Sequence, residues 1–269
     1  MARSLSLAAL TVLELAPPAQ VDCAADAGYD CVGLRLIPAT ADEVQHPMVG
    51  DTALVRETAR RLADTGVRTL DVEIFRLRPE TDVASYRPAL ETAACLGARE
   101  ALAAGNDPDA SRLVDRFASF CDLCREYGIG ANLEPMPWTD VRSFAQAARI
   151  VERAARDNGA VLIDAIHFDR GGSDAREIAS VPVERLHYVQ ICDAAAERPR
   201  DTATLLHQAR AERSMPGDGG LDLVAILRAV PRDVPVSVEV PMQTLARTVP
   251  AVERARRLRA RTRQLLDSL

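Results

Sequence analysis

The 269-residue chain contains no lysine, so arginine supplies all 33 of its basic side chains. Without an ε-amine the chain cannot run the Schiff-base chemistry of lysine-dependent aldolases and pyridoxal-phosphate enzymes, and it cannot build a Walker A phosphate loop. Positive charge is also in deficit, because 39 acidic residues bring the formal net charge to -6. A negative protein repels a phosphate backbone, so we expect no nucleic-acid partner.

Histidine is scarce, with four residues, and no GxGxxG motif follows the first apolar stretch. A zinc-dependent nuclease would need a histidine-rich cluster, and a hydride-transferring dehydrogenase would need the glycine-rich nucleotide fingerprint. The apolar stretch 4–13 is too short to span a membrane and is weak as a signal peptide, because only Arg3 precedes it and Glu14 interrupts it. We expect no membrane association.

Six cysteines are scattered through apolar stretches rather than gathered into a dense framework. This usage predicts a reduced, cytoplasmic compartment. Cys121 and Cys124 form a CxxC pair inside a helical-looking segment, with no second pair at ligand spacing. Structural zinc usually needs four ligands, so we interpret both residues as packing thiols.

Short runs rich in Val, Ile and Leu alternate with longer amphipathic segments along the whole chain. This alternation predicts repeated βα units and a parallel sheet. We predict strands near 4–10, 31–36, 69–74, 99–103, 130–133, 161–164, 188–192 and 236–240. Helices are predicted over 52–64, 82–96, 111–127 and 141–157. Glycines precede several of the strands in the manner of helix C-terminal caps, at Gly28, Gly66, Gly97, Gly128 and Gly159.

Eight βα units in about 250 residues are typical of a closed (β/α)8 barrel. The fold class is therefore α/β, and no linker divides the chain, so we predict one barrel domain over residues 1–269. An open doubly wound sheet is the runner-up, weakened by the missing nucleotide fingerprint. We also expect a homo-oligomer, although neither a heptad repeat nor an obvious patch marks an interface.

The last four predicted strands each carry an oxygen ligand at or near their C-terminal ends: Glu134, Asp164, Gln190 and Glu239. In a barrel these ends meet at one face, where enzymes of this fold build their sites. Carboxylates in an apolar setting must be paired or bind a cation. The set therefore predicts one divalent ion, Mn²⁺ or Mg²⁺ in the first place, with Co²⁺ or Zn²⁺ as alternatives.

Four segments carry a family resemblance: Leu133-Glu134-Pro135, the run from Ile163 to Arg170, the run from Tyr188 to Ala194, and the run from Arg213 to Gly219. They resemble the xylose-isomerase-like barrel superfamily, and within it the sugar phosphate isomerase/epimerase branch. That branch also holds inosose dehydratases, tagatose-type epimerases and 3-dehydroshikimate dehydratases. The resemblance implies a metal held by Glu134, Asp164, Gln190 and Glu239.

The resemblance further implies that His167 and Arg213 contact substrate, and we predict the same role for Arg170, which closes the motif. By their positions near strand ends, Arg35 and Glu73 are predicted to face the same end of the barrel and to contact substrate. Trp138 follows Glu134 in a loop, where we predict that its ring lines the substrate pocket. Many members place a histidine where this chain has Gln190. Glutamine there is similar to the dehydroshikimate-dehydratase subgroup.

The predicted function is isomerisation or epimerisation of a small sugar or keto-polyol. Glu134 and Glu239 would act as catalytic acid and base, abstracting a proton next to a carbonyl through a metal-stabilised enediolate. Expulsion of a β-hydroxyl would make the same site a dehydratase, of the 3-dehydroshikimate or inosose type. A noncatalytic sugar-binding barrel is the second alternative.

Overall fold

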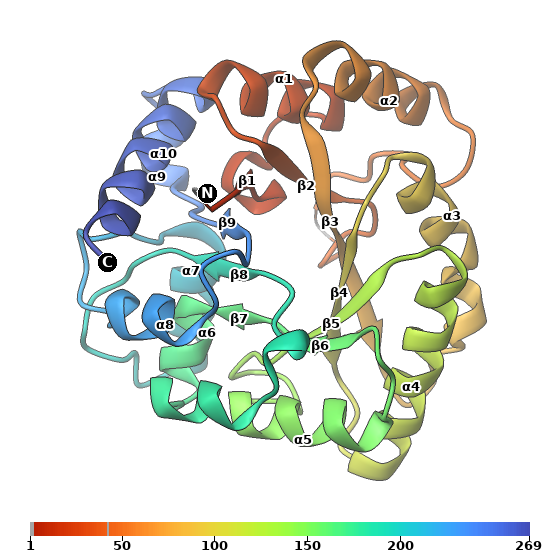
Figure 1. Cartoon of the computed structure of the whole chain (residues 1–269). Helices are drawn as coiled ribbons and strands as arrows, with labels where there is room; N and C mark the ends of the chain where they lie inside the picture. Colours follow the sequence, from red (N-terminus) through yellow and green to blue (C-terminus); the bar gives the residue numbers. More distant parts are fainter. Residues whose placement is uncertain (1–2, 42) are drawn as a thin grey trace.

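The computed structural model describes residues 3–41 and 43–269, and its strands form a ring surrounded by helices (Figure 1). Nine parallel strands pair in the order β6-β5-β4-β3-β2-β1-β9-β8-β7. β6 and β7 are separated by Leu162 alone, so they are two segments of one barrel strand. The sheet is therefore a nearly closed barrel, and the predicted (β/α)8 fold is confirmed.

The elements follow the predicted alternation of strand and helix along the chain. The strands are β1 (Leu5–Leu7), β2 (Cys31–Arg35), β3 (Arg68–Leu77), β4 (Glu100–Gly105), β5 (Gly130–Glu134), β6 (Gly159–Val161), β7 (Ile163–Asp164), β8 (Val189–Ile191) and β9 (Val236–Val238). The helices are α1 (Pro17–Ala27), α2 (Ala53–Thr65), α3 (Arg87–Cys95), α4 (Ala110–Glu126), α5 (Phe144–Ala154), α6 (Ala165–Arg170), α7 (Thr202–Ala211), α8 (Leu223–Ala229), α9 (Gln243–Ala246) and α10 (Ala251–Asp267). Short 3₁₀ helices occupy Ala9–Val12, Val83–Tyr86, Ala175–Ser180 and Val183–Arg185.

The helix ends mostly match the predicted glycine caps. Four of the five glycines adopt the left-handed backbone that glycine tolerates without strain: Gly28, Gly66, Gly97 and Gly128. Gly159 was wrongly assigned as a cap, because α5 ends at Ala154 and its C-cap residue is Ala155, which itself takes the left-handed conformation with φ 52°. Gly159 begins β6 instead, where an added Cβ would lie 3.1 Å from the Cys121 sulfur.

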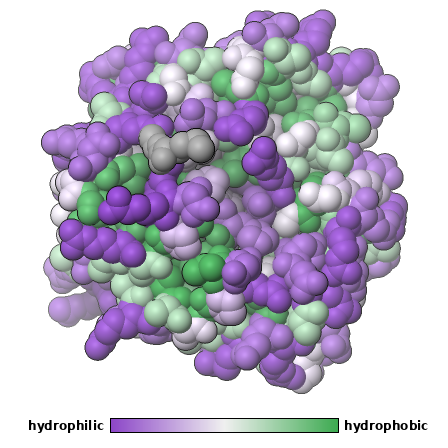
Figure 2. Space-filling view, viewed as in Figure 1, coloured by the Kyte–Doolittle hydropathy of each residue, from purple (hydrophilic) through white to green (hydrophobic). Residues whose placement is uncertain are grey.

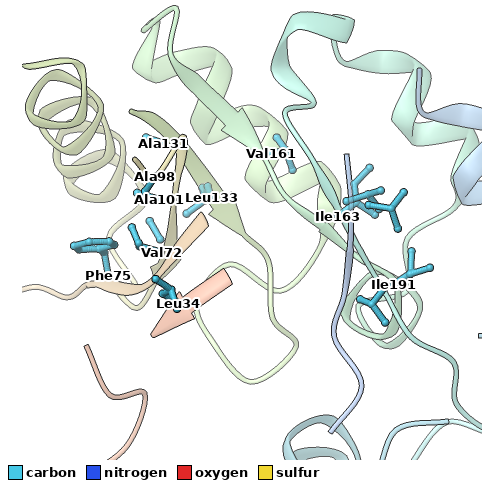
Figure 3. Close-up of a cluster of buried hydrophobic side chains, with 14 of the residues drawn as sticks. Leu34, Val72, Phe75, Ala98, Ala101, Ala131, Leu133, Val161, Ile163 and Ile191 are labelled. Atoms are coloured by element: carbon cyan, nitrogen blue, oxygen red, sulfur yellow. The ribbon is translucent and has the colours of Figure 1, made fainter. Parts of the chain in front are cut away.

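Successive side chains of each strand point to opposite faces of the sheet, and this alternation divides the apolar core into two layers. In β4, Ala101 and Ala103 join the large cluster beneath the helices, whereas Leu102 joins a separate cluster on the opposite face of the strand. Figure 3 shows part of the large cluster, with labelled side chains that come from the strands β2 to β8 and from Ala98, just before β4. Cys121 and Cys124 are buried in this cluster as free thiols, which agrees with a packing role.

The described helices and the viewed surface were compared with what a membrane span requires. None of the described helices combines the length and the apolar character needed to cross a bilayer. Figure 2 shows hydrophilic side chains spread over the viewed face, with hydrophobic residues interspersed among them. The expected homo-oligomer stays a prediction.

A buried carboxylate lies inside the barrel without a hydrogen-bond partner. Asp71 of β3 is 1% exposed, and neither of its oxygens is bonded within the described part of the chain. Gly33 of β2 makes room for it, since a Cβ at Gly33 would lie 2.9 Å from the Asp71 Oδ1 atom. Burial raises the pKa of Asp71 well above its ordinary value, and the nearby charges of Glu73 and Glu100 raise it further.

Replacing Asp71 by asparagine is expected to stabilise the protein increasingly as the pH rises. A carboxyl group whose pKa is raised in the folded state favours folding below its unfolded pKa, near 4, and loses that contribution as the pH rises through the folded value. The melting temperatures of the Asp71→Asn variant and the wild type should therefore diverge from pH 4.5 to pH 8. Asp64→Asn, at an exposed position on α2, is the matched control. A constant difference across this range would contradict the buried-charge interpretation.

Candidate active site

The four predicted ligands converge at the C-terminal ends of neighbouring strands. Glu134 ends β5, Asp164 ends β7, Gln190 lies within β8, and Glu239 directly follows β9. Their exposed fractions run from 0% for Gln190 to 4% for Glu239. The Gln190 side-chain amide donates to Glu239 Oε1 at 3.1 Å. The structure thus brings together side chains that are separated by up to about a hundred residues in sequence.

Arg213 lies between two of these carboxylates. Its Nη1 atom is 2.6 Å from Asp164 Oδ2, and its Nη2 atom is 2.9 Å from Glu239 Oε2. The Nε atom donates to the Ala209 carbonyl at 2.7 Å, which fixes the plane of the guanidinium. The Arg213 side chain is 1% exposed, so this ion-pair network is fully buried. The predicted substrate contact is therefore also the counter-cation of the carboxylate cluster.

Asp164 uses its two oxygens for different tasks. Oδ1 accepts hydrogen bonds from the backbone N–H groups of Ile166 and His167, at 3.0 and 3.1 Å, and so caps the N-terminus of α6. Oδ2 accepts from Arg213. Burial alone would raise the pKa of Asp164, but Arg213 and the other surrounding groups outweigh it and lower the pKa to about 2.

His167, on α6, lies between the carboxylates and an aromatic ring. Its Nε2 atom is 3.9 Å from Glu134 Oε1, and its ring packs edge-on against Trp138 with centroids 4.9 Å apart. Burial lowers the pKa of His167 to about 4, so the imidazole is neutral near pH 7. Its Nδ1 atom is buried without a partner among the described residues. A neutral imidazole in this position has the chemistry of a metal ligand or a proton carrier.

The donor set fits a divalent cation. Glu134, Asp164 and His167 each offer one ligand atom, and these atoms lie within 4.8 Å of one another. The Gln190 side-chain oxygen is buried and has no partner in the described chain, which leaves it available as a further ligand. Burial raises the pKa of Glu134 and of Glu239, and neighbouring carboxylates add to this rise. Buried like charges of this kind are stabilised by a bound cation.

The cluster opens into a cavity of about 570 Å³. Six of the predicted site residues line it alongside Glu134: Arg35, Glu73, Trp138, His167, Arg213 and Glu239. Arg35 is held in place by two carboxylates, with Nη2 3.0 Å from Glu73 Oε1 and Nη1 2.8 Å from Glu43 Oε1. The site therefore combines a carboxylate cluster with a pocket large enough for a small polyhydroxylated molecule.

A family model described as the xylose isomerase-like TIM barrel matches residues 21–265. The chain belongs to this family. Among curated relatives, a 3-dehydroshikimate dehydratase from Pseudomonas aeruginosa is 30% identical over 119 residues, which cover 44% of this chain and 18% of the relative. An inosose isomerase from Bacillus subtilis is 29% identical over 119 residues, covering 44% of this chain and 41% of the relative. The chain thus matches less than half the length of either relative.

Solved structures share the fold of this chain closely. The IolI protein with a bound zinc atom superimposes with a TM-score of 0.80 at 20% identity, covering 98% of both chains. A D-allulose 3-epimerase from Methylomonas superimposes with a TM-score of 0.70 at 17% identity, again covering 98% of both chains. At these identities the likeness establishes the fold. The curated relatives are enzymes, which supports an enzyme of this family.

One predicted substrate residue of this xylose isomerase-like barrel lies away from the pocket. Arg170, at the end of α6, pairs with Asp169, donates from Nε to the Gln208 side chain at 3.1 Å and from Nη2 to the Ala195 carbonyl at 2.6 Å. It does not line the cavity. The structure therefore places Arg170 as an anchor between α6 and the segments that contain Ala195 and Gln208, and its contact with substrate stays a prediction.

Two arginines that line the pocket, Arg76 and Arg210, were not identified from the sequence. Arg210 lies in the last turn of α7, three residues before Arg213 in the chain. That spacing was a usable signal. Arg76 was hidden, because the pairing of β3 with β4 shifts register between Val72 and Phe75 and breaks the simple alternation of the strand.

Proposed function

We propose that this chain is a divalent-metal-dependent isomerase or epimerase that moves a proton next to a carbonyl group of a small sugar or keto-polyol. The observation that carries the proposal is the convergence of Glu134, Asp164, Gln190 and Glu239 beside a pocket that Glu134 and Glu239 line. Such a pocket with buried carboxylates and few convergent polar groups is the usual arrangement of an active site.

Glu134, Asp164 and Glu239 would hold the ion, with Gln190 or His167 as the further ligand. When bound, the ion would polarise the substrate carbonyl and acidify the adjacent C–H bond. Arg213 already carries positive charge at Asp164 and Glu239, so it would share these carboxylates with the ion. Ion identity belongs to the proposal, with Mn²⁺ and Mg²⁺ first and Zn²⁺, which the IolI structure contains, as an alternative.

Glu134 and Glu239 are the proposed acid and base. They come from β5 and from the end of β9, which lie in different parts of the barrel wall, and both face the pocket. One carboxylate can remove a proton from a carbon atom of the substrate, and the other can return a proton to the same or the neighbouring atom. The neutral His167, 3.9 Å from Glu134, is placed to relay a proton or to bind a hydroxyl group.

A dehydratase is the second candidate, and a specific observation favours it. Two arginines of the pocket, Arg76 and Arg210, form no ion pair with a carboxylate among the described residues, which suits an acidic substrate such as 3-dehydroshikimate. The relative from Pseudomonas aeruginosa is a dehydratase of that substrate. Loss of a β-hydroxyl after proton removal needs the same two carboxylates, with one acting as the acid for the leaving group.

The test is proton exchange in deuterated water. The protein is treated with chelator, resupplied with Mn²⁺, and incubated in D₂O with a ketose, an inosose or 3-dehydroshikimate, and the products are followed by NMR. Deuterium incorporation into an isomeric product that depends on Mn²⁺ is expected for the isomerase or epimerase. Elimination of water would establish the dehydratase, seen as new aromatic signals from 3-dehydroshikimate or as a new enone or dione signal from the inosose. Absence of exchange with every compound, together with absence of metal binding, would overturn both and favour a noncatalytic sugar-binding barrel.

A further inference from the structure

Five arginines line the pocket, and they fall into two groups. Three are neutralised by carboxylates: Arg35 by Glu73 and Glu43, Arg213 by Asp164 and Glu239, and Arg254 by Glu14. Arg76 and Arg210 form no ion pair within residues 3–41 and 43–269. The guanidinium groups of Arg76 and Arg210 therefore have no carboxylate counter-ion among the described residues, unlike the other three arginines of the pocket.

Neutral groups hold Arg76 in position without neutralising it. The residue lies near the end of β3, where its side chain is partly buried. Its Nη1 atom donates to Asn106 Oδ1 at 3.1 Å, and its Nη2 atom donates to the Ala39 carbonyl at 3.2 Å. An amide oxygen and a carbonyl orient the guanidinium but leave its full charge in place. Arg76 is therefore both positioned and uncompensated.

An aromatic ring holds Arg210 in the same way. The Arg210 guanidinium lies 5.6 Å from the centroid of Trp138, within the range of a cation–π contact. Trp138 in turn packs against His167, which is next to Glu134. Arg210 thus contacts the carboxylate cluster only through Trp138 and His167 and is itself only partly buried, so it would meet a distal group of a molecule bound at the cluster.

The two free cations also influence one another. Burial lowers the pKa of Arg76, and the charge of Arg210 is the next contribution. Two like charges at a partly buried site repel, and an anion between them relieves that repulsion. Arginine is the residue best suited to hold planar oxyanions through paired N–H groups.

We infer that Arg76 and Arg210 form a subsite for an oxyanion of the substrate, a carboxylate or a phosphate, at the outer part of the pocket. The inference rests on the proposed function, because it assumes that the reacting end of the molecule lies at the carboxylate cluster. It narrows the substrate class from neutral sugars to acidic polyols or sugar phosphates. The guanidinium pair would then select the substrate and orient it, while the chemistry stays with Glu134 and Glu239.

Binding of matched charged and uncharged ligands tests this subsite. Titration calorimetry of the Mn²⁺-loaded protein would compare quinate with its methyl ester, and D-fructose 6-phosphate with D-fructose. The same four ligands would be titrated into Arg76→Gln, Arg210→Gln and Arg210→Lys. Arg228→Gln, at an exposed arginine on α8, removes an equal charge elsewhere and serves as the control.

We expect one charged ligand to bind at least about tenfold more tightly than its uncharged counterpart, because hydrogen bonds to charged groups are the strong ones. Tighter binding of quinate than of its methyl ester would identify the bound oxyanion as a carboxylate. Tighter binding of D-fructose 6-phosphate than of D-fructose would identify it as a phosphate. Each glutamine variant should remove most of that preference while leaving the uncharged ligand unaffected, Arg210→Lys should restore part of it, and Arg228→Gln should behave as wild type. Equal binding within both pairs, or a preference that survives both glutamine substitutions, would overturn the inference.

Failure of this inference and failure of the proposed function give different results. The calorimetry needs no turnover, so a charge preference that depends on Arg76 and Arg210 stands even if no proton exchange occurs. Conversely, Mn²⁺-dependent exchange on neutral ketoses alone would retain the proposed chemistry and reject the anion subsite. The two experiments therefore separate the reacting end of the pocket from its outer end.

Discussion

Replacing Glu239 by glutamine is expected to slow metal-dependent deuterium incorporation by about 10²- to 10⁴-fold while the barrel stays folded. The substitution keeps the shape of the side chain and removes its negative charge and its basicity. Glu239 is 4% exposed and contacts both Arg213 and Gln190, so an amide at the same place can still accept a hydrogen bond. Exchange rates by NMR and thermal unfolding by circular dichroism measure the two effects.

The control for this prediction is Glu152→Gln. Glu152 is an exposed glutamate of α5, so its substitution removes the same charge at a distance from the pocket. It should leave both exchange and unfolding as in the wild type. A Glu239→Gln protein with wild-type exchange would show that Glu239 is neither an acid–base group nor an essential metal ligand.

Replacing Arg213 by alanine is expected to lower the free energy of unfolding of the metal-free protein by about 3–5 kcal/mol. The side chain is 1% exposed and is bound by two buried carboxylates, so its removal leaves Asp164 and Glu239 charged and unpaired. A divalent cation supplies positive charge to the same carboxylates. The loss should therefore be smaller in Mn²⁺ than in chelator, which thermal unfolding under both conditions measures.

Two comparisons make this second prediction specific. Arg228→Ala removes an exposed arginine of α8 and should change unfolding little in either condition. Titration of the Arg213→Ala protein with Mn²⁺ should raise its melting temperature more than that of the wild type. An Arg213→Ala protein that loses equal stability with and without Mn²⁺ would mean that the arginine and the ion do not act on the same carboxylates.

The sequence was sufficient to place the barrel strands, because each βα unit repeats the same local pattern. All eight predicted strands coincide with observed ones, including 161–164, which the structure shows as β6 and β7 on either side of Leu162. The ends were harder to place. β3 continues to Leu77, beyond the predicted end at Ile74, because shifts in its pairing with β2 and β4 interrupt the two-residue alternation.

The candidate site was predictable in part, for a physical reason. Residues at strand ends are placed by the fold itself, so Glu134, Asp164 and Glu239 could be expected to meet. Arg213 contacts Asp164 although it lies 49 positions later in the chain, in the long segment that follows β8. No local sequence pattern predicts that this segment folds back onto Asp164. The pairing state of Arg76 and Arg210 depends on which carboxylates lie nearby in space, and sequence does not contain that information.

The double role of Asp164 has a consequence for which amino acid can stand there. Two of the three carboxylates around the proposed ion belong to glutamates and one belongs to an aspartate. Coordination of the ion by a carboxylate oxygen does not by itself require an aspartate at position 164. The backbone does, because a side-chain oxygen can cap α6 from the N-cap position only when it is short, as in Asp, Asn, Ser or Thr. Of these residues only aspartate also carries the charge that meets Arg213. The helix therefore selects the ligand at this position, and His167, carried on that helix, is held in register with the carboxylates by the same side chain.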